Sequence, residues 1–452
     1  ILMKNLTFIP LNRDLDYHAT KTTLINIGNS MNAVLDTIDI KNFRSQYSLI
    51  TIAVGGSVTI KSSNFSHNNF NQTGCLIDIA SSQTYFALND SILMNNSFSL
   101  GPNTLAFHSA ICVNSDSAKV ILNSSSFIKN YAASGAVLSV VTLPFTSSAM
   151  FGRLKTTIEN CTFVDNTATS LGGALAQTGG SFEVNNSSFI NNTASEKGGA
   201  IYLSAFTHVR ITDSLFLQNS VKSRVVSTVY GGAVYIDIVM EDPSTQNRSL
   251  AIQNNKFFNN SATNEDSEGI GGGGAMFIEF HDVIPTDSQL FEALMNLSWD
   301  NEFIGNSADS GNELSTLPYS STFGVYNSTK ELDHCYQSPC KLSEQIRADH
   351  FHGFYLHIGF IDFYGQSLDI KRNIRPSSVA KMTLQITNQS QIYFDSNCSI
   401  GHCIINGNDA TIRGLANQDV NLTFNVTSPG AAPFNFVLMT SIRPCQVGEI
   451  ND

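Results

Sequence analysis

The sequence predicts an all-β protein in which a right-handed parallel β-helix is followed by an antiparallel β-sandwich. Two motifs recur together along the first 312 residues, and their two clearest copies lie 26 residues apart. Between the motifs, short runs alternate apolar and polar residues with the period of two that is typical of β-strands. Beyond residue 350 the repeats stop, and turn signals recur about every 8–12 residues, as in a sandwich of about seven strands.

Each full repeat contains Phe-x-x-Asn followed by Gly-Gly-Ala and an apolar residue. One copy has Gly-Gly-Ala-Leu at 172–175, and the next has Gly-Gly-Ala-Ile at 198–201. The Phe positions are Phe127, Phe163, Phe189, Phe216, Phe257 and Phe303, and the Asn positions are Asn130, Asn166, Asn192, Asn219, Asn260 and Asn306. Less regular copies occur at Phe65 and Leu93, and we expect a degenerate first copy at Phe43.

A 26-residue repeat is too short for a propeller blade, which needs about 40 residues and hairpin turns. A parallel β-helix fits better, with three short strands and three turns per coil and about a dozen coils stacked at ~4.8 Å. Because a residue that recurs once per coil forms a column, we expect the phenylalanines to stack inside the solenoid. We expect the asparagines to form an amide ladder at a turn, and the Gly-Gly pairs to supply turns with positive φ.

The predicted domains are a β-helix over 1–312, a connector with a disulfide loop over 313–349, and a β-sandwich over 350–452. The connector contains Pro318 and Pro339 and is expected to be irregular. Strands of the sandwich are expected at 354–363, 380–387, 391–394, 410–412, 420–426 and 434–440. The pair Pro444-Cys445 predicts that the natural chain continues into a cysteine-rich module.

The chain is poor in charge. Charged residues make up 14% of it, against about 25% in an average soluble protein, and the net charge is −12. An acidic chain without clustered Lys and Arg is not expected to bind nucleic acid. The apolar run at 135–145 is shorter than the ~20 residues of a membrane helix, so we expect no membrane span in this segment. The chain begins with Ile1 and no leader precedes Asn5, which indicates a processed mature chain or a fragment.

The tripeptide Asn-x-Ser/Thr, the acceptor sequence for N-glycosylation, is about twice as frequent as this composition supplies by chance. This excess favours a secreted glycoprotein with covalent N-glycans. The alternative is that an Asn-rich solenoid produces such tripeptides as a by-product. The expected acceptors are Asn5, Asn64, Asn71, Asn89, Asn95, Asn123, Asn160, Asn185, Asn186, Asn191, Asn247, Asn259, Asn296, Asn327, Asn388, Asn397, Asn421 and Asn425. Because several stand at fixed offsets from the repeat motifs, we expect carbohydrate in vertical stripes on one or two faces.

The cysteines also indicate an oxidising compartment. Cys335 and Cys340 are five residues apart, as are Cys398 and Cys403, and this spacing predicts two loop-closing disulfides. Each pair could instead be half of a zinc site, but no second pair of ligands stands nearby. Cys445 is expected to pair with Cys75, Cys112 or Cys161, or with a cysteine beyond residue 452.

The paired motifs Phe-x-x-Asn and Gly-Gly-Ala resemble the repeats of the chlamydial polymorphic outer membrane protein family. They are also similar to repeats in secreted surface proteins of single-celled eukaryotes. The resemblance covers residues 43–311 and implies a β-helical segment displayed outside the cell, for adhesion or surface structure. The excess of acceptor tripeptides makes the chain more similar to the protist proteins than to the bacterial ones.

Some β-helices are polysaccharide lyases or glycoside hydrolases, so an enzyme is the alternative function. Such chemistry needs clustered carboxylates and a nearby Arg or Lys. Arg210 with His208 and Thr212 forms the basic and polar cluster on an expected strand, but the sequence places no acid beside it. Asp213 and Asp90 share one repeat position, which indicates a structural role. The acids Glu265, Asp266 and Glu268 stand in a polar insertion and are expected to be solvated. We therefore expect no enzymatic activity.

We expect neither cofactor nor metal. His350, His352 and His357 could share a strand face but are interpreted as surface residues. The run of glycines at 271–274 lacks the Lys-Ser/Thr of a phosphate-binding loop. Exposed aromatic rows would indicate a glycan-binding adhesin, and the single Trp299 disfavours it. The expected function is therefore that of an extracellular structural or adhesive protein, a subunit of a fibre or surface appendage, which associates with itself or with other surface glycoproteins.

Overall fold

The computed structural model divides into two compact units, Ile1–Glu279 with Ile284–Leu314, and Phe280–Val283 with Ser315–Asp452. Each is described here by itself. The residues that the structure describes are 1–8, 23–72, 74–80, 82–100, 108–141, 153–224, 228–238, 248–265, 270–280, 288–316, 320–327, 330–335, 340–341, 346–347, 354–364, 380–386, 392–398, 402–406, 419–427 and 434–443.

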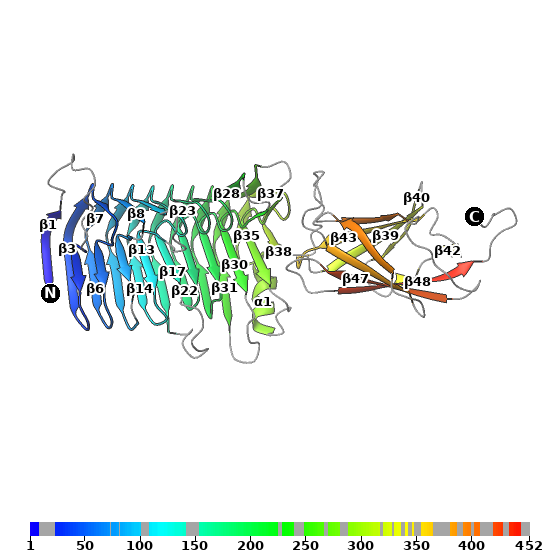
Figure 1. Ribbon diagram of the computed structural model, residues 1–452, viewed down its shortest axis with the longest axis horizontal. Helices are drawn as coiled ribbons and strands as arrows, with labels where there is room; N and C mark the ends of the chain where they lie inside the picture. Colours follow the sequence, from blue (N-terminus) through cyan, green and yellow to red (C-terminus); the bar gives the residue numbers. More distant parts are fainter. Residues whose placement is uncertain are drawn as a thin grey trace. The chain divides into compact units, whose positions relative to one another are not determined.

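The first unit is a solenoid of stacked parallel strands (Figure 1). Its seventeen-stranded sheet contains two columns that share β3. The first column is β1 (Leu2–Phe8), β3 (Asn32–Lys41), β6 (Ser57–Lys61), β10 (Tyr85–Asn89), β14 (Lys119–Asn123), β18 (Lys155–Glu159), β22 (Ser181–Asn185), β26 (His208–Thr212) and β31 (Ser249–Gln253). The second column is β7 (Asn64–Ser66), β11 (Ile92–Met94), β15 (Ser126–Ile128), β19 (Thr162–Val164), β23 (Ser188–Ile190), β27 (Leu215–Leu217), β32 (Lys256–Phe258) and β36 (Glu302–Ile304).

Two further sheets complete the coils. The third column is β4 (Arg44–Ser45), β8 (Asn69–Gln72), β12 (Ser97–Leu100), β16 (Tyr131–Ala132), β20 (Thr167–Ala168), β24 (Thr193–Ala194), β28 (Ser220–Ser223), β33 (Ser261–Asn264) and β37 (Ser307–Ala308). The fourth is β2 (Ile25–Ile27), β5 (Ile50–Ile52), β9 (Ile77–Ile79), β13 (Ile111–Asn114), β17 (Leu138–Val141), β21 (Leu175–Thr178), β25 (Ile201–Ser204), β30 (Val234–Ile238), β35 (Met276–Phe280) and β38 (Leu314–Thr316). A small side sheet pairs β29 (Thr228–Tyr230) with β34 (Ile270–Gly272).

The parallel solenoid is confirmed, and one detail of the prediction is wrong. A coil has four strands instead of three, because the polypeptide bends twice, before and after each short strand of the second column. Both bends use residues with positive φ, such as Asn186 (47°) and Asn191 (53°). The fourth column has ten strands in the described part of the chain, and the sequence predicts about a dozen coils. The right-handedness of the solenoid stays a prediction.

The central residue of each second-column strand points into the solenoid. The rings of Phe127, Phe163, Phe189, Phe216, Phe257 and Phe303 form a continuous stack, with successive centroids 4.6–5.0 Å apart. Phe65 and Leu93 continue this column toward the N-terminus, as expected. All of these rings except the half-buried Phe303 are fully buried, and they supply much of the apolar contact between neighbouring coils.

The Asn column forms the predicted amide ladder. Asn166 shows the pattern: its Nδ2 donates to Oδ1 of Asn192 at 3.0 Å and to the Phe127 carbonyl at 3.0 Å. The backbone N–H of Asn166 donates to the same Oδ1 of Asn192 at 3.1 Å. The ladder runs through Asn68, Asn96, Asn130, Asn166, Asn192, Asn219, Asn260 and Asn306. Each buried amide is therefore satisfied by the next coil, which fixes the register of the stack.

The expected first copy at Phe43 is wrong by three residues. Ile40 pairs with Phe65 and so occupies the Phe position of that coil. Phe43 instead occupies the Asn position, where its backbone N–H donates to Oδ1 of Asn68 at 3.0 Å. The ladder ends here because a Phe side chain has no amide with which to continue it.

The single described helix was not expected. α1 (Ser288–Asn296) lies against β31, where the next strand of the first column would stand. Its Leu290 and Leu294, with Leu297 just beyond, are buried at 2%, 0% and 1% exposure. Three leucines at helical spacing therefore cover the apolar edge of the column.

The second unit contains a four-stranded antiparallel sheet in the order β40 (Lys330–Cys335), β39 (Ser320–Asn327), β43 (Phe354–Ile361) and β46 (His402–Asn406). Its other sheet is β41 (Cys340–Lys341), β48 (Phe434–Arg443), β47 (Asp419–Thr427), β44 (Ala380–Ile386) and β45 (Ile392–Cys398), with β42 (Ile346–Arg347) also on β48. Residues 313–349 were expected to be irregular, but β39 and β40 form a hairpin that pairs with β43. The expected strand at 410–412 lies outside the described residues, and the packing of a sandwich stays a prediction.

Candidate functional site

The two bends beside the second column carry five of the acceptor asparagines that the structure describes in the solenoid, and these are Asn95, Asn160, Asn186, Asn191 and Asn259. The first bend stacks Thr37, Ser62, Asp90, Ser124, Asn160, Asn186, Asp213 and Asn254, all with positive φ. The second stacks Asn42, His67, Asn95, Lys129, Asp165, Asn191, Gln218, Asn259 and Gly305, also with positive φ. Asn and Asp tolerate this conformation better than most residues, which explains their frequency here. Asp90 and Asp213 share one position of the first bend, as the repeat predicts.

Acceptor and ladder asparagines differ in exposure. The buried asparagines are Asn68, Asn96, Asn130, Asn166, Asn192, Asn219, Asn255, Asn260, Asn264 and Asn306, and none begins an Asn-x-Ser/Thr tripeptide. The acceptors whose exposure the structure gives are half-buried or exposed, and they are Asn5, Asn64, Asn89, Asn95, Asn123, Asn160, Asn185, Asn186, Asn191, Asn259 and Asn296. Asn247 and Asn388 lie outside the described residues, and so do the side chains of Asn71, Asn327, Asn397, Asn421 and Asn425.

The basic cluster on β26 has an acidic partner that the sequence did not place. Glu183 stands beside Arg210 in the register of β22 and β26. Its Oε1 is 2.9 Å from Lys155 Nζ and 3.9 Å from His208 Nε2, and His208 Nδ1 contacts Ser249 Oγ. A single carboxylate on this open face does not supply the acid and base pair that glycoside cleavage needs.

A second polar group lies on the outer side of the fourth column. Lys197 Nζ is 2.6 Å from the Tyr235 hydroxyl and 3.0 Å from Glu279 Oε2, and that hydroxyl also donates to Glu279. Ser204 Oγ donates to Asp237 Oδ2 at 3.1 Å. These carboxylates accept hydrogen bonds from neighbouring coils, so they join the coils in the same way as the ladders.

The aromatic side chains beside this group are buried rather than displayed. Tyr202 stacks on Tyr235 and Tyr235 on Phe277, with centroids 5.4 and 5.9 Å apart. Burial raises the pKa of Tyr202 to about 12, and the negative charges of Asp237, Glu279 and Glu196 act in the same direction. A row of aromatic residues therefore exists, but Tyr235 and Phe277 are 0% and 2% exposed and offer little surface to a sugar ring.

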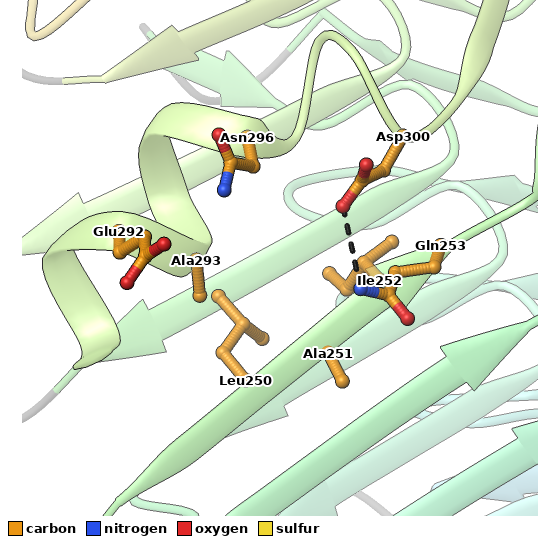
Figure 2. A pocket seen from close by; sticks show the side chains of 8 residues that line it. All are labelled: Leu250, Ala251, Ile252, Gln253, Glu292, Ala293, Asn296 and Asp300. Carbon is orange, nitrogen blue, oxygen red and sulfur yellow. Dashed lines mark hydrogen bonds between the residues drawn. The ribbon is translucent and has the colours of Figure 1, made fainter.

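A small cavity of about 210 Å³ lies between α1 and β31 (Figure 2). It is lined by Leu250, Ala251, Ile252, Gln253, Glu292, Ala293, Asn296 and Asp300. Gln253 Nε2 donates to Asp300 Oδ2 at 3.3 Å across its rim. The lining offers no nucleophile beside a base, so the cavity has the character of a packing gap where helix and strand meet.

The structure excludes two of the partners predicted for Cys445. Cys75 and Cys112 form a disulfide with their Cα atoms 6.1 Å apart, so neither is available to Cys445. Cys161 is a free, buried thiol. The side chains of Cys335, Cys340, Cys398 and Cys403 and all of Cys445 lie outside what the structure describes, and their disulfides stay predictions.

Cys161 belongs to a third ladder, at the first bend, that the sequence analysis missed. Its backbone N–H donates to Ser187 Oγ at 3.1 Å, and its thiol donates to the Glu159 carbonyl at 3.2 Å. The same two bonds are made along the column by Ser63, Ser91, Ser187 and Ser214, and Asn255 continues it. The sequence carries this ladder as a small polar residue two positions before each central residue of the second column, namely Ser63, Ser91, Ser125, Cys161, Ser187, Ser214, Asn255 and Asn301.

No cluster of three or more His, Cys, Asp or Glu side chains suited to a metal ion occurs among the described residues. His350 and His352 lie outside them, and His357 is paired with Gly324 and Ile404 in the register of its sheet. Glu265 is exposed and bonded to Arg224, while Asp266 and Glu268 are not described. Within the part of the chain that the structure describes, no helix is long and apolar enough to cross a membrane.

A family model described as the Chlamydia polymorphic membrane protein repeat matches residues 186–204. Residues 186–204 are therefore similar to one repeat of that family. The matched segment spans β23, β24 and β25. Phe189 lies in β23, Asn192 stands directly before β24, and the Gly-Gly-Ala-Ile at 198–201 leads into β25. No curated protein and no solved structure matches the chain.

Proposed function

We propose that this chain is a secreted, N-glycosylated structural protein of the cell surface. In this role it is a subunit of an extracellular fibre or appendage, or an adhesive surface protein. Its partners are further copies of itself or other surface glycoproteins, and its secretory route is eukaryotic, as in the protist proteins that its repeats resemble. The polymorphic membrane protein repeat at 186–204 supports a place at the cell surface.

The observation that carries the proposal is the division of the asparagines into two sets. The ladder asparagines are buried and lack the acceptor tripeptide, while the acceptors with described exposure all reach the surface. Each ladder amide uses its hydrogens within the stack, so a sugar there would break the fold. A solenoid that is glycosylated during secretion needs its acceptor asparagines on the outside.

The stacked ladders suit a structural role. Phe rings, amides and hydroxyls repeat at every coil, so each coil is held by the same contacts on both sides. Such a solenoid is a rigid spacer whose length grows with the number of coils. The disulfide between Cys75 and Cys112 fits an oxidising compartment.

Glycopeptide mapping and electron microscopy of the protein from its native source test the proposal. We expect carbohydrate on several acceptors of the two bends, Asn160, Asn186, Asn191 and Asn259 among them, and filaments or a surface layer in the images. An unglycosylated, strictly monomeric particle that cleaves a polysaccharide would replace the proposal with the polysaccharide-active enzyme.

A further inference from the structure

A row of apolar side chains runs along the outside of the second column. Because the central Phe of each three-residue strand points inward, the residue after it points outward. In register, these outward residues are Met94, Ile128, Val164, Ile190, Leu217, Phe258 and Ile304. We call them the exterior stripe.

The exterior stripe is unusual for a protein surface. Its members lie on consecutive strands, about 4.8 Å apart, so they form one continuous patch rather than scattered residues. Ile304 is 57% exposed, and the others are half-buried. Scattered apolar residues on a surface need no explanation, but a contiguous apolar patch marks a place that something covers.

Each residue of the exterior stripe is followed directly by a residue of the second bend. Three of these neighbours are acceptors, and they follow Met94, Ile190 and Phe258 as Asn95, Asn191 and Asn259. The two coils between Asn95 and Asn191 carry Lys129 and Asp165 instead. In every coil from Met94 to Phe258, the apolar side chain therefore stands beside an acceptor Asn, a charged residue or Gln218.

Contacts of the acceptor amides suit sugars that lie along the column. Asn191 Nδ2 donates to Asp165 Oδ1 at 2.6 Å, and Asn95 Nδ2 is 3.2 Å from His67 Nε2. An N-linked sugar replaces one of the two hydrogens on Nδ2, so the other remains to make this bond. A bond to the neighbouring coil would fix the direction in which the sugar leaves the bend.

We propose that the N-linked glycans of Asn95, Asn191 and Asn259 lie over the exterior stripe. The apolar faces of their first sugars pack against Met94, Ile190 and Phe258 and their neighbours, and the hydroxyl groups face water. This inference rests on the proposed glycosylation. It explains how a surface poor in charge and lined with apolar side chains stays in solution.

The test compares two sets of variants of the whole chain, secreted from a eukaryotic host. In the first set Asn95, Asn191 and Asn259 become Gln, a residue that the second bend already accepts with positive φ at Gln218. In the matched control set Asn89, Asn123 and Asn185, which end strands of the first column, become Gln. Glycopeptide mapping of the wild type establishes occupancy, and binding of a hydrophobic dye and the molar mass by light scattering report exposure of the stripe.

We expect the first set to bind severalfold more dye than the wild type and to self-associate, while the control set does neither. Adding Ile190→Ser and Phe258→Ser to the first set should return both signals to the level of the wild type. Equal dye binding in the first set, with all three sites occupied in the wild type, overturns the inference.

Other outcomes separate the inference from the function on which it rests. Empty sites at Asn95, Asn191 and Asn259 with sugar on other acceptors refute the inference alone. An absence of sugar from every acceptor refutes the glycoprotein as well. A glycosylated wild type that is a dimer, and that Phe258→Ser makes monomeric, would show that a second copy covers the exterior stripe instead.

Discussion

At the scale of single residues, the stability of the solenoid depends on polar side chains that recur once per coil. Asn192 is fully buried, and its side chain takes part in four hydrogen bonds with the two neighbouring coils. Its Oδ1 accepts from the backbone N–H and the Nδ2 of Asn166, and its Nδ2 donates to the Phe163 carbonyl and to Asn219. Such a residue holds three coils in register.

Asn192→Ala should therefore lower the free energy of unfolding by about 3–5 kcal/mol, since it leaves several buried groups without partners. The exposed neighbour Asn191 provides the control, because Asn191→Gly keeps the left-handed backbone and should cost about 1 kcal/mol or less. Chemical denaturation monitored by circular dichroism measures both. Equal losses in the two variants would contradict the role assigned to the ladder.

Cys161 makes a second prediction at this scale. Burial raises the pKa of its thiol to about 12, from an ordinary value of 9.0. Because the folded protein holds this thiol protonated, ionisation of the thiol favours the unfolded chain. The contribution of the thiol to the free energy of unfolding is therefore complete below pH 9 and is lost as the pH rises from 9 to 12. In Cys161→Ser that loss should be absent, and the native wild-type thiol should not react with a maleimide at pH 8. Denaturation curves from pH 8 upward, and reagent labelling before and after unfolding, check both parts.

At the scale of elements, the second glycine of each Gly-Gly pair decides how closely the coils approach. A Cβ on Gly199 would lie 2.0 Å from the carbonyl oxygen of Gly232 and 2.7 Å from the backbone of Ser220. The first glycine, Gly198, has a φ of 66°. The motif thus combines a left-handed turn with a contact between backbones, and only glycine meets both requirements.

Gly199→Ala should destabilise the solenoid by at least about 3 kcal/mol or prevent its secretion, because the backbones of two coils must separate. Gly28 is a fair control, since a Cβ there meets only the Met31 sulfur at 3.4 Å. Gly28→Ala should change stability by about 1 kcal/mol or less. Thermal unfolding of both variants decides the matter, and a tolerant Gly199 would disprove the close approach.

Strands were easier to predict than the elements that interrupt them. The period of the repeats predicted the second column, because every coil from Phe127 to Phe303 has an inward Phe flanked by two outward residues. α1 was not predicted, because its apolar residues are spaced for a helix only within an insertion of the repeat. Leu290 and Leu294 of α1, with Leu297 just beyond it, become buried because the helix lies against the edge of β31.

At the scale of the whole molecule, the disulfide joins two parts of the chain whose contact the repeat motifs do not predict. Cys75 and Cys112 are 37 residues apart, and the bond closes a loop that contains a whole coil. In the chain-entropy view, closing a loop of this length removes freedom from the unfolded chain.

Replacing both Cys75 and Cys112 by Ala should lower the free energy of unfolding by about 4 kcal/mol. Reduction of the wild type should have a similar effect and none on the double variant. Denaturation in the presence and absence of a reductant measures this, and a stability that does not respond to reductant would show that the bond is absent from the folded protein.

The sequence by itself determined the columns of this protein, because a side chain repeated once per coil must stack on its own copies. The sequence also determined which asparagines lie inside. A ladder Asn uses both its amide oxygen and its amide N–H groups within the stack, and no ladder position begins an acceptor tripeptide. Only the tertiary structure decided which residues of different columns meet. Ladder partners such as Asn260 and Asn306 are 46 residues apart, and insertions of variable length hide their register. The disulfide, the Ser ladder with Cys161, the acid beside Arg210 and the exterior stripe all depend on pairing across coils, which spacing along one coil does not contain.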